Sequence, residues 1–299
     1  MKIAFSPVYS LPLPPGHRFP MLKYELLPEQ LLREGLVDSS DFFQPSLLPW
    51  SVAAAVHSHT YVHKLKTLDL AHKEIRRIGF PLSSLLVERE RVIAQGSVDN
   101  ALLAIEKKIS FNVAGGTHHA YAEHGEGFCV LNDIAIAASF LLNKGLAERI
   151  LVIDLDVHQG NGTAHIFKED NRVFTFSMHG ANNYPLHKEN SNLDLSLADG
   201  ITDRPYLALL ESHLQSIFES FEPQVVFYQS GVDVLESDKL GRLALSPEGA
   251  KMRDRLVFEY CKQADIGVAV SMGGGYSAKL SDIVDAHVRT FEEAIKVYG

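Results

Sequence analysis

The amino-acid sequence predicts a single α/β domain in which a doubly wound, mostly parallel β-sheet is flanked by helices. Three observations support this fold class. Short, nearly continuous apolar runs recur along the chain, segments with helical periodicity separate them, and no linker or low-complexity tract interrupts the alternation. A length of 299 residues fits one large α/β domain. We therefore predict one domain over residues 1–299.

The predicted strands are apolar runs that do not alternate strictly with polar residues. Such runs are typical of strands that helices cover on both faces, as in a parallel sheet. In chain order the predicted strands are residues 3–5, 111–113, 150–155, 173–177, 225–229 and 266–271.

Helices are predicted over residues 131–144, 204–220 and 247–262, where apolar residues recur at helical spacing. Gly145 is expected to end the first helix, and the Ser246-Pro247 pair is a typical helix start. The proline-rich segment 11–20 is predicted to be a loop. Residues 37–60 and 75–90 look irregular or weakly helical, and we expect them to form loops on one rim of the sheet.

The composition excludes several classes of protein. Hydrophobic residues make up 46% of the chain and charged residues 22%, and the 28 Lys and Arg against 37 Asp and Glu leave a net charge of -9. A broad nucleic-acid surface is therefore not expected. The two cysteines, Cys129 and Cys261, form neither a disulfide framework nor a zinc-binding pair. No run approaches the roughly 20 apolar residues that cross a bilayer, so we expect a cytoplasmic protein without a membrane partner.

Residues that can bind a ligand cluster just after the predicted strands. In open α/β sheets, ligands bind beyond the carboxyl ends of the strands, so these side chains are expected at one edge of the sheet. The segments are GGTHHA at 115–120, DLDVHQGNG at 154–162, SMHG at 177–180, SGVDVLESD at 230–238 and MGGGY at 272–276.

The spacing of Asp154, Asp156 and His158 predicts a metal site. Residues two apart project to the same side of an extended chain, so all three can point into one site, and Asp233 can add an oxygen from a neighbouring strand. Three protein ligands with open positions for water and substrate describe a catalytic site for Zn²⁺, or for Fe²⁺ or Co²⁺. The alternative is that these acids cap helices or form surface turns.

The tandem His118-His119 offers acid–base chemistry next to that site. One imidazole can accept a proton from water and return it to a leaving amine, while its neighbour stabilises charge. The two rings would titrate as a coupled pair. The alternative is that adjacent histidines at a strand end are simply exposed.

The glycines before Tyr276 suggest a sharp turn toward the metal. Gly273, Gly275 and Ala278 formally satisfy a dinucleotide-binding pattern, but too little chain follows for a second βαβ half. The glycines instead allow the backbone to turn so that the Tyr276 hydroxyl can bind a carbonyl oxygen that becomes an oxyanion. The alternative is a packed aromatic side chain.

Taken in order, GGTHHA, GFC, DLDVHQGNG, GVDVLESDKLG and GGGY closely resemble the motifs of the zinc-dependent histone deacetylase superfamily, which has the arginase/deacetylase fold. The segments DLDVHQGNGT and DVLESDKLGRLALSPEGAKMRDRLVF look most like its class IV branch and bacterial relatives. The resemblance runs from residues 17–24 to the final helix.

This resemblance implies a role for each motif residue. His119 would be the general base and acid, supported by Asn161 where class I enzymes have a carboxylate, and Asp154 would support His118. The implied zinc ligands are Asp156, His158 and Asp233, Tyr276 would polarise the carbonyl, and the implied channel residues are Gly127, Phe128, Tyr184 and Gly274. A structural K⁺ would take oxygens from Asp154, Ser177 and Met178, with Asp156 and His158 adding backbone oxygens.

The resemblance leaves one family residue unplaced. An aspartate that grips the substrate backbone in the family has no certain counterpart among residues 70–95. Arginases have acids where this chain has His119 and Gln159, so a two-manganese site is not expected.

We therefore predict a zinc-dependent deacylase that hydrolyses the amide of an acyl-lysine through a metal-activated water, with Fe²⁺ as the alternative metal. One alternative is a deacetylase of small amines such as acetylpolyamines. For these an acidic, narrow entrance would be expected, whereas an open entrance suits an acyl-lysine peptide or protein. A second alternative is a metal-containing protein that binds acyl-lysine without turnover. The sequence gives no indication of acyl-chain length or oligomeric state.

Overall fold

An eight-stranded sheet, in which every neighbouring pair of strands is parallel, forms the centre of the molecule. The prediction of one α/β domain with a sheet between helices is confirmed, and the sheet is wholly rather than mostly parallel. The computed structural model describes all residues 1–299. The strands lie in the order β2-β1-β3-β8-β7-β4-β5-β6 and comprise β1 (Lys2–Ala4), β2 (Phe42–Phe43), β3 (Ile109–Asn112), β4 (Ile150–Asp154), β5 (Val173–Gly180), β6 (Leu193–Leu197), β7 (Val225–Gln229) and β8 (Gly267–Ser271).

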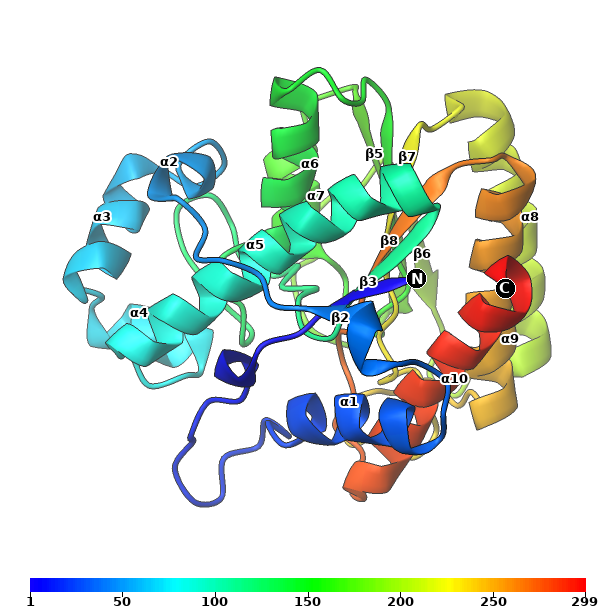
Figure 1. The fold of residues 1–299 in the computed structure, drawn as a ribbon, viewed down its shortest axis with the longest axis horizontal. Coiled ribbons are helices and arrows are strands. Elements are labelled where there is room, and N and C mark those ends of the chain that lie inside the picture. The colour runs from blue at the N-terminus through cyan, green and yellow to red at the C-terminus, as the bar shows by residue number, and fades with distance from the viewer.

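Helices cover both faces of this sheet (Figure 1). Helices α5 and α6 pack together on one face, with α5 against β3 and β8, whereas α8, α9 and α10 lie on the other. Helix α1 packs against α10. The helices are α1 (Lys23–Arg33), α2 (Trp50–Ala53), α3 (His59–Thr67), α4 (His72–Ile78), α5 (Ser84–Lys107), α6 (Asp133–Asn143), α7 (Asn161–Phe167), α8 (Asp203–Phe221), α9 (Pro247–Gln263) and α10 (Leu280–Tyr298), with short 3₁₀ turns at Pro7–Tyr9 and Ser39–Asp41.

The central strands are buried along their whole length. Every residue of β3, β4, β7 and β8 is buried, which is why their sequences lack polar alternation. Strand β4 pairs with β7 and β5, and this register sets Asp154 opposite Gln229 and Ser177. The residues after these strands therefore start from neighbouring positions at one edge of the sheet.

Side-chain caps mark the start of helices α6 and α9. The Asn132 side chain accepts a hydrogen bond from the Ala135 N–H at the start of α6 (2.9 Å), and Ser246 accepts one from the Gly249 N–H at the start of α9 (3.0 Å). The three predicted helices are present as α6, α8 and α9, each with bounds within two residues of the prediction.

Other predicted elements differ from the structure. Residues 84–90 are not loop but the first turns of α5, whose 24 residues carry apolar and polar side chains buried on most sides, so no simple apolar stripe marks it. Short helices also occupy parts of 37–60. The edge strands β2 and β6 were not predicted, because partly exposed edge strands lack a continuous apolar run. Strand β5 continues beyond the predicted end at Ser177 to Gly180, so that Met178 lies within the strand instead of after it.

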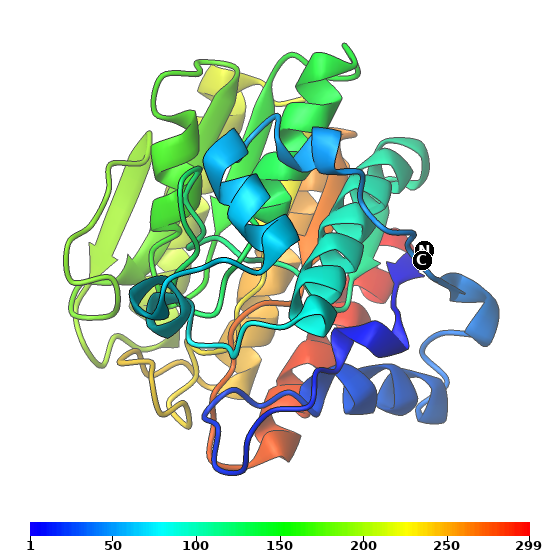
Figure 2. The same ribbon diagram turned by 90° about the vertical axis from the view of Figure 1, so that its left-hand side faces the viewer.

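A cluster of short segments lies to one side of the sheet. Figure 2 shows the short helix α4, the loop of residues 11–20 and the segment after β7 at the lower left of the same view. These three segments line a common cavity of about 420 Å³. None of the helices has a stretch that is both long and apolar enough for a transmembrane span.

Candidate metal-dependent active site

Three buried side chains form a cluster able to hold a metal ion. Asp156 and His158 follow β4, and Asp233 follows β7, the strand paired with it. Their ligand atoms all lie within 4.8 Å of one another. The Nδ1 atom of His158 is 3.0 Å from Asp156 Oδ1 and 3.2 Å from Asp233 Oδ2. The predicted metal ligands are therefore brought together from two neighbouring strands.

The surroundings of this cluster fit a bound cation. Asp233 is fully buried, yet its Oδ2 atom accepts no hydrogen bond, and burial together with the nearby Asp156 carboxylate raises the pKa of Asp233 to about 7. Two buried carboxylates at such short range are unfavourable unless a cation compensates them. Gly274, at φ 52°, lets the chain pass against them, because a Cβ there would lie 2.6 Å from Asp233 Oδ2 and 2.7 Å from Asp156 Oδ2.

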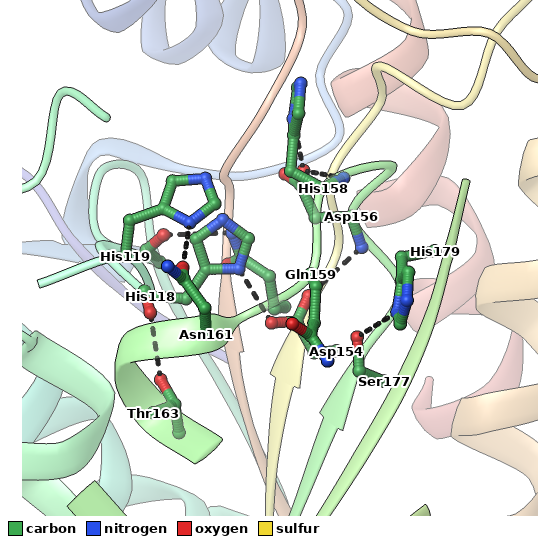
Figure 3. Close-up of polar contacts among 12 residues, drawn as sticks. His118, His119, Asp154, Asp156, His158, Gln159, Asn161, Thr163, Ser177 and His179 are labelled. Atoms are coloured by element: carbon green, nitrogen blue, oxygen red, sulfur yellow. Dashed lines mark hydrogen bonds and ion pairs between the residues drawn. The ribbon is translucent and has the colours of Figure 1, made fainter. Parts of the chain in front are cut away.

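Asp154 lies apart from this cluster, contrary to the simple alternation argument. The extended strand ends at Asp154, and its Oδ2 atom accepts a hydrogen bond from Nδ1 of His118 at 2.7 Å (Figure 3). Both side chains are buried. Burial disfavours the charged imidazole, but the carboxylate outweighs burial and raises the pKa of His118 to about 9. This ring is therefore cationic at neutral pH.

His119 has a neutral partner instead. Its Nδ1 atom lies 2.6 Å from Oδ1 of Asn161, the first residue of α7 (Figure 3). The Asn161 Nδ2 group donates to Glu126 Oε1 at 2.8 Å and to the Tyr121 hydroxyl at 3.0 Å, so Oδ1 must face the ring. His119 Nδ1 therefore carries the proton, and Nε2 is left as an acceptor. Burial, together with His118 and His158, lowers the pKa of His119 well below its usual range.

Tyr276 lines the same cavity as His119 and His158. It follows the glycines after β8, and its ring lies 6.3 Å from that of His158. Its backbone N–H donates to Asp238 Oδ2, which fixes the turn. Burial and the carboxylates of Asp233 and Asp156 raise the pKa of the hydroxyl well above its usual range. The hydroxyl is therefore protonated at neutral pH and is available as a donor.

Aromatic rings surround the approach to these groups. The Tyr184 ring lies 5.0 Å from the His119 ring at 89°, and the Phe128 ring lies 6.2 Å from the Tyr276 ring. Gly127 adopts φ 57°, and a Cβ there would lie 2.7 Å from His119 Cδ2. Gly127, Phe128 and Tyr184 line the 420 Å³ cavity together with His119, His158 and Tyr276. Gly274 does not line it, but borders a smaller inner cavity beside the metal ligands.

The residues expected around a potassium ion lie together on β4 and β5. Asp154 and Ser177 are paired in the parallel register, and Met178 follows in the same strand. The backbone N–H of Asp156 donates to Asp154 Oδ1 at 3.2 Å, and the Ser177 hydroxyl lies 2.9 Å from His179 Nδ1. The potassium role of these residues stays a prediction.

Several residues close to the site were not identified from the sequence. Glu126 and Tyr121 lie behind Asn161, and Lys23 is a buried cation whose ammonium group donates to the Gly274 carbonyl. Burial lowers the pKa of Lys23 to about 8. Glu126 immediately precedes the GFC motif, but nothing in its spacing indicates that it contacts a residue 35 positions away.

Comparisons with known proteins agree with this geometry. The family model described as the histone deacetylase domain matches residues 17–291. An uncharacterized protein of Picosynechococcus sp. is 43% identical over 296 residues, which cover 99% of each chain. Histone deacetylase 2 of Arabidopsis thaliana is 30% identical over 278 residues, covering 90% of this chain and 72% of the plant protein.

The fold also matches solved structures. The crystal structure of a histone deacetylase homologue from Aquifex aeolicus superimposes with a TM-score of 0.84 at 24% identity, covering 98% of this chain and 83% of that one. A histone deacetylase homologue complexed with SAHA gives a TM-score of 0.85 at 24% identity, covering 99% and 84%. At this identity the likeness concerns the fold alone. The family model and the plant relative show that this chain belongs to the histone deacetylase family.

Proposed function

We propose that this protein hydrolyses the amide of an acyl-lysine, releasing a carboxylate and the free ε-amine of lysine. The observation that carries the proposal is that three residues line one 420 Å³ cavity: His158 of the cluster able to hold a metal ion, His119 with its free Nε2, and Tyr276 with its protonated hydroxyl. These are the groups that amide hydrolysis requires.

Asp156, His158 and Asp233 would hold the metal, for which we propose Zn²⁺, with Fe²⁺ as the alternative. When bound, such an ion is a Lewis acid that polarises the acyl carbonyl and makes water more acidic. We also propose that K⁺ binds beside Asp154, Ser177 and Met178, with Asp156 and His158 adding backbone oxygens. The DLDVHQGNG segment supports a place for the chain in the class IV branch.

The chain's own groups would carry the proton transfers. The Nε2 atom of His119 accepts a proton from the attacking water, because its Nδ1 is already occupied by Asn161. The imidazolium then donates this proton to the departing amine nitrogen as the carbon–nitrogen bond breaks. His118, held cationic by Asp154, adds positive charge beside the reaction without giving up its own proton.

Tyr276 would stabilise the carbonyl oxygen. Its hydroxyl stays protonated at neutral pH and can donate a hydrogen bond as the oxygen becomes negatively charged. The rings of Phe128 and Tyr184 would flank the aliphatic part of the lysine side chain, excluding water from it.

The decisive experiment is a substrate panel with purified, zinc-loaded protein. Acetyl-lysine peptides, longer acyl-lysine peptides and acetylspermidine are incubated with the protein, and the released acid and amine are quantified by mass spectrometry. Tyr276→Phe should lower kcat by about 10²–10³ while leaving peptide affinity nearly unchanged. Binding of acyl-lysine peptides with no release of acid would show a binding protein instead, and preferred turnover of acetylspermidine would show a polyamine deacetylase.

A further inference from the structure

The mouth of the 420 Å³ cavity carries four arginine side chains and no carboxylate. Arg18, Arg76, Arg77 and Arg242 are exposed and line it above His119 and His158. The chain as a whole has the opposite balance, with 37 acidic residues against 28 basic ones and a net charge of -9. A concentration of positive charge at the entrance of a negatively charged protein favours binding of anionic groups there.

Two of these arginines are fixed next to the channel wall. Arg76 and Arg77 lie in the last turn of α4, and the backbone of this turn is joined to the GFC segment. The Gly127 N–H donates to the Arg77 carbonyl at 3.1 Å, and the Phe128 N–H donates to the Ile78 carbonyl at 2.7 Å. The same residues that form the channel wall thus hold α4 at the mouth.

The other two arginines come from separate segments. Arg18 follows His17, whose ring stacks on Phe80 with centroids 5.6 Å apart and whose Nε2 lies 2.8 Å from the Gly79 carbonyl. The backbone carbonyl of Arg242 accepts a hydrogen bond from Gly200 at 2.7 Å. Three segments distant in sequence therefore each place positively charged arginine at the mouth of the cavity.

Most of this charge is not neutralised within the protein. Only Arg242 forms an ion pair, with Asp199 at 3.2 Å, whereas Arg18, Arg76 and Arg77 form none. Cations in the last turn of a helix interact favourably with its carboxyl end, which accounts for arginines on α4. It does not account for Arg18 and Arg242, which lie on loops.

Building on the proposed function, we propose that this enzyme selects acyl-lysines flanked by aspartate or glutamate. Only the lysine side chain enters the channel, so neighbouring residues of the substrate stay at the mouth. Residues within two positions of the lysine lie about 4–8 Å from it along the chain, within reach of the arginines. Acylated polyamines carry positive charge at the same place and would be repelled.

The proposal is tested with two peptides of equal length that carry the same acetyl-lysine, flanked either by glutamates or by glutamines. The wild-type enzyme should prefer the glutamate peptide by about fivefold in kcat/KM at low salt. The preference should reside mainly in KM and should decline at high salt, because these are exposed charges. Replacing both Arg76→Gln and Arg77→Gln should remove most of it.

Two controls accompany this measurement. Arg33→Gln removes an exposed arginine from the last turn of α1, outside the cavity, and should leave the preference unchanged. Peptide affinity measured by fluorescence anisotropy on the Tyr276→Phe protein shows the preference without turnover, and thermal unfolding checks that each variant is folded.

The outcomes separate the two proposals. Equal kcat/KM for the two peptides, or a preference for acetylspermidine over both, would overturn the charge selection while hydrolysis of the glutamine peptide upheld the proposed deacylase function. If neither peptide were hydrolysed by zinc-loaded protein, the proposed function would fail first. A glutamate preference that survived replacement of all four arginines of the mouth by glutamine would also contradict the proposal, because another group would then have to recognise the acids.

Discussion

His118 and His119 are neighbours in sequence, their rings are 4.1 Å apart, and both are buried, yet the structure gives them opposite electrostatic character. Burial disfavours the imidazolium at both positions. Asp154 overcomes burial at His118, whereas Asn161 offers His119 only a neutral oxygen. The partner atom on Nδ1, and not burial, therefore decides which ring is a fixed cation and which is free to exchange a proton.

The two partners also differ in what lies behind them. Asp154 ends strand β4 and contacts His118 directly, so the sheet fixes the position of its carboxylate. Asn161 is itself held by Glu126, which also accepts a hydrogen bond from the Tyr184 hydroxyl at 2.7 Å. The Glu126 carboxylate is thus also near His119, but Asn161 lies between the carboxylate and the ring. Glu126 therefore influences the pKa of His119 more weakly than Asp154 influences that of His118.

The largest effect is expected when the metal cluster that both histidines face is removed. Asp233→Ala deletes one of three ligands and should abolish both metal binding and turnover. Metal content is measured by elemental analysis and activity with an acetyl-lysine peptide. The contacts of His118 and His119 should persist in this variant, since neither involves Asp233. Substantial turnover by metal-free protein would refute the metal-dependent mechanism.

Replacing each histidine in turn separates the two roles. His119→Gln should lower kcat by about 10²–10⁴, the range typical for loss of a general base. His118→Gln should cost less, because that ring supplies charge and not a proton acceptor. Both variants are compared at matched zinc occupancy under steady-state conditions. A larger loss of kcat for His118→Gln than for His119→Gln would mean that His118, and not His119, is the general base.

Asp154→Asn should make the two histidines alike. With its anionic partner gone, buried His118 should lose its raised pKa, which is followed by NMR of the imidazole. Breaking this buried pair should destabilise the fold by about 3 kcal/mol at pH 6.

The pH dependence of this loss has a defined sign. The folded-state pKa of His118, about 9, lies above the ordinary value of 6.5. The stabilisation is therefore complete below pH 6.5 and disappears as pH rises through 9. Denaturant unfolding of wild type and Asp154→Asn at pH 6, 7.5 and 9 should show a shrinking difference. A difference that stayed constant would mean that the pair is not charged as described.

The smallest effect is expected from giving His119 a carboxylate partner. Asn161→Asp alone would place two carboxylates together, because Glu126 lies 2.8 Å from the Asn161 amide. The substitution is therefore made in a Glu126→Gln background, where the glutamine can donate to the new aspartate. An adjacent anion favours imidazolium, so the pKa of His119 should rise.

The readout is the acidic limb of the kcat/KM profile. Since His119 must be neutral to accept a proton, a higher pKa moves this limb to higher pH. Glu126→Gln alone serves as the control and should move it slightly to lower pH, because a distant anion has been lost. If the acidic limb of the double variant lies at the same pH as that of the Glu126→Gln control, the Asn161–His119 contact does not set the pKa of the general base.

The sequence by itself was enough to predict the fold class and the edge of the sheet that carries the site. Strands β4, β7 and β8 are buried on both faces, so their apolar runs are unambiguous, and helix α9 starts at the predicted Ser246-Pro247 pair. The three residues of the cluster able to hold a metal ion were also within reach of sequence reasoning. They follow two of these strands directly, and parallel strands bring such residues to one edge.

Other features were decided only by tertiary contacts. Strands β2 and β6 lie at the edges and gain their structure from a neighbour, and α5 is stabilised by packing on the sheet. Glu126 reaches Asn161, and the arginines of the mouth come together from three separate segments. These depend on loop conformations that have no periodic pattern. Local sequence specifies burial and caps, whereas the partner of a buried polar group and the charge at a cavity mouth are set by residues that only the folded chain brings close.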